Sequence, residues 1–333
     1  MIEVIKKIGI NILNFNALSL LGVFFIRRKK EMDERKSKIG GLAIVIAASL
    51  WGLDGIVLTP RLYNLDTKFV VFMLHLLPFI GMNFIFYKEY KALKKFTKYD
   101  YIFMTLVALF GGVIGTLSIV KALFLLNFQH LTIVTLLQKL QPVFAIVLAR
   151  FILKEKIAKK FVVWAMLALT AGYFLTFEFS NPFSIEHQNM LEASMYAIVA
   201  AFAFGSSTVF GKRMVSTITH KQTLFFRYGL TTLILAVVNV LSNNFGQFSK
   251  ITTLNWQIFI IIGLTSGSGA AFIYYYGLRH VKANVATICE LSFPISSILF
   301  DYLFNGSILS PFQWVSMSIM IFSIIKITKL KTN

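Results

Sequence analysis

Apolar residues form long runs along most of the chain, and short polar links separate these runs. Run length predicts helices at residues 39–60, 68–87, 101–122, 131–153, 161–178, 191–211, 222–242, 256–277, 284–304 and 310–328. A run of about 18 to 23 apolar residues is long enough for one helix to cross the hydrocarbon core of a bilayer, where the backbone must satisfy its own hydrogen bonds. The pattern therefore predicts an all-α integral membrane protein with ten transmembrane helices.

The composition agrees with a bilayer as the solvent. Hydrophobic residues make up 57% of the chain and charged residues 14%, whereas an ordinary soluble domain carries about 25% charged residues. A soluble core cannot absorb this much apolar surface. The single cysteine, Cys289, lies inside an apolar run, so no intrachain disulfide can form.

Lysine and arginine are distributed unequally between alternate links. One set of links is rich in them and comprises residues 27–38, 88–98, 154–160, 212–221, 279–282 and 326–331. The other set holds Arg61, Lys68 and Lys250. Because basic residues are retained in the cytoplasm, both ends of the ten-helix body are expected on the cytoplasmic side of the cell inner (plasma) membrane. The basic clusters form no continuous face, so the net charge of +19 does not predict a nucleic-acid partner.

The first segment, residues 1–38, is treated as an N-terminal extension. Residues 8–26 are apolar but interrupted by asparagines, and no cleavage pattern of small residues precedes Arg27. A secretory signal peptide is therefore not expected. Three interpretations stay open: an eleventh helix, an interfacial helix, or a non-native start upstream of a functional body that begins near Met32. The last two are favoured.

An internal repeat divides the rest of the chain into residues 39–178 and 191–328. A constant offset of 152 places equivalent residues on one another: His75 on Arg227, Gly111 on Gly263, Gly115 on Gly267, Thr135 on Thr287, Gln138 on Glu290 and Pro142 on Pro294. Each repeat holds five predicted helices, an odd number, so the second copy enters the membrane from the opposite side. Two inverted five-helix repeats are a recurring plan of secondary transporters.

Polar residues in the fourth and ninth predicted helices form a candidate substrate site. Pro142 and Pro294 cannot donate to the carbonyls of Gln138 and Glu290, so each polar side chain is expected beside a free backbone acceptor. The expected central cluster contains Gln138, Lys139, Gln141 and Glu290. The alternative is a packing kink whose polar groups bond between helices.

Glu290 and Lys139 carry the chemistry expected of this cluster. An acid this deep in the membrane is costly unless it is paired, hydrated or protonated, which makes Glu290 the candidate for proton coupling. Lys139 is the candidate counter-ion for Glu290 or for an anionic substrate.

Five further residues are candidates for contact with substrate: Trp51, Asp54, His75, Arg227 and Tyr275. Asp54 follows Trp51 closely and is expected to face the cavity from the outer half of the first helix. His75 and Arg227 occupy equivalent positions, although a hydrogen-bonded histidine and a snorkelling or ion-paired arginine are open alternatives. Tyr275, within a run of three tyrosines, is expected either at the cavity or in an interfacial belt.

Signatures of enzymes and cofactors are missing from the sequence. The five histidines are scattered without metal-site spacing, and no phosphate-binding GxxxxGK[ST] loop is present. No catalytic residue, metal or cofactor is predicted.

Several segments resemble the EamA-like branch of the drug/metabolite transporter superfamily, over about residues 39 to 328. They are Trp51-Gly52, Phe226-Arg227-Tyr228, residues 140–157, and residues 276–287 running into Pro294. The sequence departs from the family pattern at Lys154, which precedes Glu155 in place of glycine, at Gly306-Ser307, which lacks the acid, and at His75, which replaces an arginine. The resemblance implies export or exchange of amino acids, related metabolites or amphipathic compounds through a central cavity.

The sequence thus predicts a secondary-active or facilitative transporter that exports or exchanges a small metabolite by alternating access. The expected partners are this small molecule, membrane lipid and protons as a coupling ion, with a monomer and a homodimer both open. An alternative is an exchanger of phosphorylated or nucleotide-like anions held by Lys139 and Arg227. An alternative of another class, a lipid-handling membrane enzyme, would need converging catalytic groups that the sequence lacks.

Overall fold

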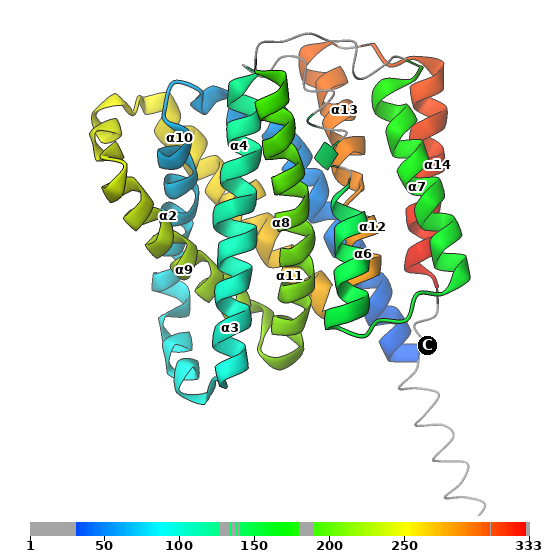
Figure 1. The fold of residues 1–333 in the computed structure, drawn as a ribbon, viewed down its shortest axis with the longest axis horizontal. Helices are drawn as coiled ribbons and strands as arrows, with labels where there is room; N and C mark the ends of the chain where they lie inside the picture. The colour runs from blue at the N-terminus through cyan, green and yellow to red at the C-terminus, as the bar shows by residue number, and fades with distance from the viewer. Residues whose placement is uncertain are drawn as a thin grey trace, which may run out of the picture.

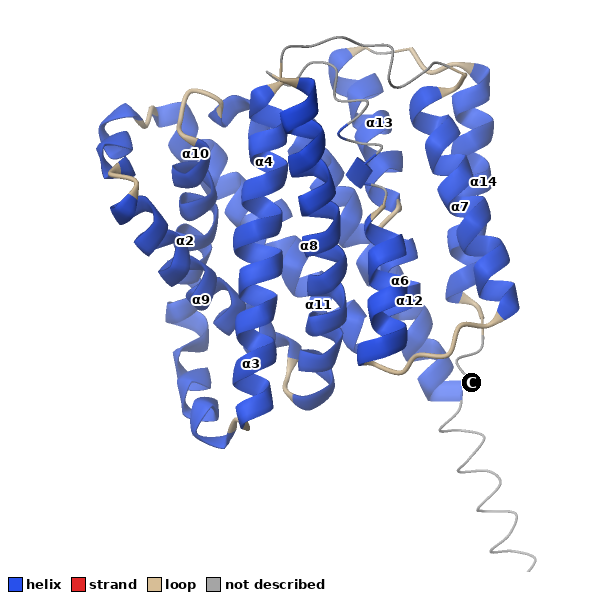
Figure 2. Cartoon of the chain, in the orientation of Figure 1, coloured by secondary structure: helices blue, strands red, loops and turns tan. Residues whose placement is uncertain are grey.

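The structure of the chain is a computed structural model that describes residues 31–126, 134, 137–138, 140–179, 189–306 and 308–330. Within these residues every regular element is a helix (Figures 1 and 2), as the sequence predicts. Eight helices of the described part are long and apolar enough to cross a membrane. Of the other two predicted spans, 161–178 corresponds to α7 (Lys159–Phe177), and 131–153 contains α6 (Gln141–Ile152) in its second half, while part of its first half lies outside the described residues; the total of ten stays a prediction. Residues 1–30 of the N-terminal extension, Thr135 and Lys139 lie outside the described residues.

The first half opens with a helix over residues 31–62, so residues 31–38 of the predicted extension belong to this helix. Its last two turns are a π-helical segment, η1 (Asp54–Leu58), and a 3-10 turn, η2 (Thr59–Leu62). The elements that precede α6 and α7 are α2 (Thr67–Phe86), η3 (Tyr87–Lys95), α3 (Lys98–Val107), η4 (Ala108–Ile114) and α4 (Gly115–Leu125).

The second half repeats this order of elements. It comprises α8 (Met190–Thr217), α9 (His220–Leu241), η5 (Asn244–Lys250), α10 (Thr253–Ile262), η6 (Gly263–Gly267), α11 (Ser268–His280), α12 (Ala283–Cys289), α13 (Ser292–Asn305) and α14 (Pro311–Thr328). In Figure 1 the cyan link η3 lies at the bottom of the molecule, whereas its yellow counterpart η5 lies at the top. The two halves therefore run in opposite directions, and the predicted inverted repeat is confirmed.

Helix starts follow from local sequence. Among the described helices, four begin with a capping box, in which a Ser or Thr side chain bonds the amide three residues on and the side chain of that residue bonds back. The pairs are Thr97 with Asp100, Thr219 with Gln222, Thr252 with Asn255, and Ser310 with Gln313. These caps satisfy amides that a helix leaves open at its first turn, so the links between spans are short and fixed.

The predicted helix 284–304 is broken in the middle. α12 ends at Cys289 and α13 begins at Ser292, which places Glu290 in the break. Pro294 has no amide proton to continue the helix. The amide of Phe293 instead donates to the Glu290 carbonyl at 3.0 Å. The expectation of a free carbonyl at Glu290 is therefore wrong, because the break supplies a tighter bond in its place.

In the part of the chain that the structure describes, three π-helical segments, η1, η4 and η6, interrupt the long helices. In each, a hydroxyl reaches back five residues: Thr59 to the Asp54 carboxylate at 2.8 Å, Thr116 to the Gly111 carbonyl at 3.0 Å, and Ser268 to the Gly263 carbonyl at 2.7 Å. The last two bonds are related by the offset of 152, so the repeat extends to this irregular detail. Single π turns inside helices occur frequently at functional sites.

The halves pack through pairs of helices, notably α2 with α9, α4 with α8, α6 with α8 and α7 with α14. Small residues allow these helices to approach one another closely. A methyl group added at Gly112 would overlap the side chain of Thr231, and one added at Gly111 would overlap Ser207. The packed helices position one cavity between the two halves.

Candidate functional site

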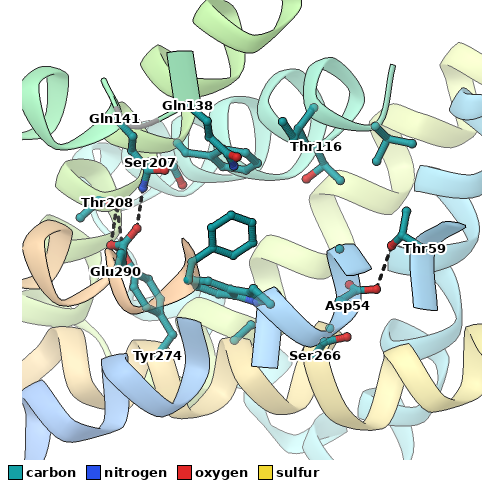
Figure 3. A pocket seen from close by; sticks show the side chains of 18 of the residues that line it. Asp54, Thr59, Thr116, Gln138, Gln141, Ser207, Thr208, Ser266, Tyr274 and Glu290 are labelled. Atoms are coloured by element: carbon teal, nitrogen blue, oxygen red, sulfur yellow. Dashed lines mark hydrogen bonds between the residues drawn. The ribbon is translucent and has the colours of Figure 1, made fainter. Parts of the chain in front are cut away.

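A cavity of about 280 Å³ lies between the two halves (Figure 3). The first half contributes walls from the helix 31–62, α2, α4 and α6, and the second half contributes walls from α8, α9 and α11. The break between α12 and α13 adds Glu290. Polar lining residues are Asp54, Thr59, His75, Thr116, Gln138, Gln141, Ser207, Thr208, Arg227, Ser266, Thr287 and Glu290.

The Glu290 carboxylate accepts hydrogen bonds from three uncharged groups. Tyr274 donates its hydroxyl at 2.9 Å, Thr208 lies at 3.3 Å, and the amide of Gln141 donates to the other carboxylate oxygen. The hydroxyls of Thr208 and Tyr274 are themselves 3.0 Å apart. Donors of this kind satisfy a partly buried carboxylate without a paired cation, so Glu290 can exchange partners with a ligand or a proton.

Arg227 forms a second polar centre on a different wall. Its guanidinium donates to the Tyr275 hydroxyl at 3.1 Å and lies 5.7 Å from the centre of the Tyr275 ring. Its Nε is buried and has no hydrogen-bond partner among the described residues. Within the same part of the chain no carboxylate pairs with this guanidinium, so Arg227 presents an uncompensated positive charge at the cavity.

Asp54 and His75 also contribute titratable side chains to the lining of the cavity. Figure 3 places Asp54 and Ser266 close together, away from Glu290. The Ser266 hydroxyl is buried and has no partner among the described residues. His75 Nδ1 lies 2.9 Å from the Val71 carbonyl and serves as the donor there, which leaves Nε2 as an acceptor.

Aromatic side chains cover much of the remaining wall. They come from both halves and are Trp51, Phe204, Tyr228, Tyr274 and Phe293. The rings of Trp51 and Tyr274 are 5.3 Å apart and tilted. Flat apolar walls with a few polar groups are typical of sites for small organic ligands. Among the described residues no group of His, Cys, Asp or Glu could hold a metal ion.

The structure brings most of the sequence-predicted site residues to this one cavity, and their contact with substrate stays a prediction. Those in the lining are Trp51, Asp54, His75, Gln138, Gln141, Arg227 and Glu290. Tyr275 lies behind the wall at 1% exposure, because consecutive helical residues point about 100° apart and its neighbour Tyr274 takes the lining position. Lys139 is outside the described residues.

Sequence reasoning missed Thr208 and Ser266, and within the run of three tyrosines it singled out Tyr275 where Tyr274 lines the cavity. Thr208 ends the run Gly205-Ser-Ser-Thr208 in the apolar middle of α8, and that run of small and hydroxyl residues is a signal that could have identified the wall of α8. Ser266 lies in η6, where a π turn changes the helical phase, so its direction could not be read from spacing.

An inverted pair of helical repeats around a polar cavity defines a membrane transporter. The EamA-like transporter family model matches residues 38–177 and again residues 191–329. The chain therefore belongs to the EamA-like transporter family, as the resemblance in its sequence implied, and it is a multi-pass membrane protein that transports rather than an enzyme.

Relatives support the same class. The chain is 56% identical over 292 residues to the riboflavin transporter ImpX of Fusobacterium nucleatum, which covers 87% of this chain and 98% of the relative. It is 25% identical over 200 residues to the uncharacterized transporter YwfM of Bacillus subtilis, covering 56% of this chain and 60% of the relative. A protein of known crystal structure superposes with a TM-score of 0.60 over 87% of this chain and 94% of that chain; at 14% identity this shows the fold alone.

Proposed function

We propose that this chain carries riboflavin across the membrane through the cavity between its two halves. The observation that carries the proposal is the 56% identity with a riboflavin transporter over 98% of that relative's length. The sequence predicts an amino acid or a related amphipathic compound as the substrate. Riboflavin belongs to the second group, since it joins a flat aromatic ring system to a chain of hydroxyl groups.

The cavity suits such a molecule in its chemistry. Aromatic side chains, among them Trp51 and Phe293, offer surfaces on which a flat ring can stack. Amide and carboxyl groups of Gln138, Gln141 and Glu290 offer hydrogen bonds to hydroxyls. Its volume of about 280 Å³ is near the lower end of small-molecule pockets, roughly 300–1,000 Å³, so substrate binding is expected to need some widening.

Alternating access would supply this widening. Two inverted halves can exchange conformations and expose a central site to either side in turn. The break at Glu290 and the π segments η4 and η6 are the points at which the helices can bend. Because Glu290 has uncharged partners, it is the group proposed to bind and release a proton during this exchange.

The proposed orientation has both ends of the helical body in the cytoplasm. In Figure 1 the ends of the body lie at the bottom, and η3, the α6–α7 link and the α8–α9 turn lie there too. These links are the lysine- and arginine-rich ones. The positive-inside bias therefore supports ten spans with this end of the molecule facing the cytoplasm of a bacterial inner membrane.

The test is flux in proteoliposomes of the purified chain, with riboflavin followed by its own fluorescence. Saturable riboflavin movement above protein-free vesicles is expected, while amino acids supplied in parallel should not move. Loading the inner or the outer compartment gives the direction, for which export is the expectation from sequence. Imposing a pH gradient tests proton coupling. Riboflavin flux equal to that of empty vesicles would refute the proposal.

A further inference from the structure

The cavity holds two polar centres of opposite chemistry, and this difference sets how a flavin lies in it. We propose that Arg227 binds the carbonyl-bearing edge of the flavin ring and that the Glu290 cluster binds the hydroxyls of the ribityl chain. The Glu290 cluster is defined here as Glu290 with Gln141, Thr208 and Tyr274. The inference rests on the proposed function and adds an orientation to it.

Helix α11 supplies one tyrosine to each of the two centres. Its consecutive residues Tyr274 and Tyr275 serve different partners, since Tyr274 donates to Glu290 at 2.9 Å and Tyr275 accepts from Arg227 at 3.1 Å. Side chains one residue apart on a helix diverge by about 100°. The hydrogen bonds of Glu290 go to Gln141, Thr208 and Tyr274, and that of Arg227 goes to Tyr275, so among the described residues the two groups are not paired and a ligand meets them as separate sites.

Arg227 can only donate hydrogen bonds. Tyr275 takes one of its N–H groups, and its buried Nε has no partner among the described residues. A charged donor left in this state is costly in a membrane protein, so a ligand rich in acceptors is favoured at this wall. The outer edge of a flavin carries two carbonyl oxygens and ring nitrogens as acceptors, against a single N–H donor.

Glu290 shows the reverse preference. An ionised carboxylate only accepts, and its present donors are the neutral groups of Gln141, Thr208 and Tyr274. The four hydroxyls of a ribityl chain can replace or extend these donors, and the amide of Gln138 lies in the same lining. With the flavin reversed, carbonyl oxygens would face a carboxylate, which is repulsive.

A different ligand could use Arg227 in another way. A phosphate group also matches the planar fork of a guanidinium, so a phosphorylated flavin would place its phosphate, at the far end of the ribityl chain, against Arg227. That arrangement reverses the proposed orientation, and the experiment must separate the two.

The experiment measures binding to the purified chain by quenching of flavin fluorescence. The ligands are riboflavin, riboflavin 5′-phosphate and lumiflavin, which has the same ring system with a methyl group in place of the ribityl chain. The variants are Arg227→Gln, Arg227→Lys and Glu290→Gln, with Arg279→Gln as the control because Arg279 is exposed and outside the lining. Both affinities are measured on the same preparation of each variant. A loss of folded protein affects the two measurements equally, so it does not change the ratio of riboflavin affinity to lumiflavin affinity.

We expect Arg227→Gln to weaken the binding of riboflavin and of lumiflavin by a similar factor, which is about tenfold or more for the loss of a hydrogen bond from a charged group. Arg227→Lys, which keeps the charge and loses the fork, should weaken both less. Glu290→Gln should weaken the binding of riboflavin about tenfold and leave the binding of lumiflavin unchanged. Arg279→Gln should change neither.

In the opposite pattern, Arg227→Gln lowers the affinity for riboflavin alone and Glu290→Gln lowers the affinity for both riboflavin and lumiflavin. That result would reverse the proposed orientation of the flavin, while the proposed function would stand. If the wild-type protein binds riboflavin 5′-phosphate more tightly than riboflavin, and Arg227→Gln removes this difference, then Arg227 binds a phosphate group and not the edge of the flavin ring. Wild-type protein that binds none of the three flavins would refute the proposed function as well.

Discussion

Glu155 ties the first half of the chain to the second at the end of the molecule that carries the basic links. Its carboxylate, 9% exposed, accepts hydrogen bonds from the backbone amides of Ala283 at 2.8 Å and Asn284 at 3.1 Å, at the start of α12. On the other side of the same turn, Lys212 donates to the last carbonyls of α11, those of Leu278 and Arg279. The turn between α11 and α12 is therefore held by an acid at a helix start and a base at a helix end.

Replacing Glu155 by alanine should destabilise the folded protein by about 2–4 kcal/mol. A hydrogen bond to a charged group contributes about 1.5–3 kcal/mol, and a negative charge at a helix N-terminus adds about 0.3–1 kcal/mol. The two bonds share one carboxylate and are not additive, and water can reach the freed amides in part, so the loss is smaller than the simple sum. Glu155→Gln retains one acceptor oxygen and should lose about half as much.

Thermal unfolding in detergent provides the assay, with the chain's single cysteine as the reporter. Cys289 is fully buried, so it reacts with a fluorogenic maleimide when the protein unfolds. The matched control is Lys156→Ala, because Lys156 is exposed and adjacent in sequence. An unfolding midpoint for Glu155→Ala no lower than that of Lys156→Ala would refute this reasoning.

Three further predictions concern the cavity and its helices. Glu290→Gln should make riboflavin flux insensitive to an imposed pH gradient; flux that still follows the gradient would show that another group carries the proton. Gly112→Ala should lower the unfolding midpoint through about 1–3 kcal/mol of overpacking against Thr231. Gly81→Ala, which meets open space inside α2, should keep or raise the midpoint, because alanine favours the helix over glycine; a Gly112→Ala midpoint no lower than that of Gly81→Ala would contradict the packing. Ser268→Ala, which removes the hydroxyl bond from Ser268 to the Gly263 carbonyl across η6, should lower maximal flux and keep riboflavin affinity, whereas the control Ser318→Ala should change neither; wild-type flux in Ser268→Ala would exclude this role for η6.

Hydropathy and the repeat predict much of the fold because both depend on residue type and spacing. The predicted span 68–87 is α2, Thr67–Phe86, and the span 310–328 is α14, Pro311–Thr328. The offset that aligns Gly111 with Gly263 also aligns the π segments. The break at Glu290 was not predicted, because a proline identifies a disturbed helix but does not decide between a kink and a break.

The candidate site could be predicted in part for the same reason. Charged and amide residues inside apolar runs are few, so Gln138, Arg227 and Glu290 were visible from sequence. The run of three tyrosines was visible too, but which of them lines the wall was not, because η6 precedes α11 and its wide turn shifts the face that Tyr274 and Tyr275 present. The bonds from Glu155 to α12 join residues far apart in the chain, and only the fold brings them together.

The most direct test of a central pathway is the reactivity of one cysteine in the cavity wall, measured from both sides of a sealed vesicle. Ser207→Cys in a Cys289→Ala background places this thiol in the lining. An impermeant maleimide added on either side should label it, and riboflavin should protect it from both. Labelling from one side alone, or labelling unaffected by riboflavin in vesicles that still transport it, would contradict a carrier that exposes this cavity alternately.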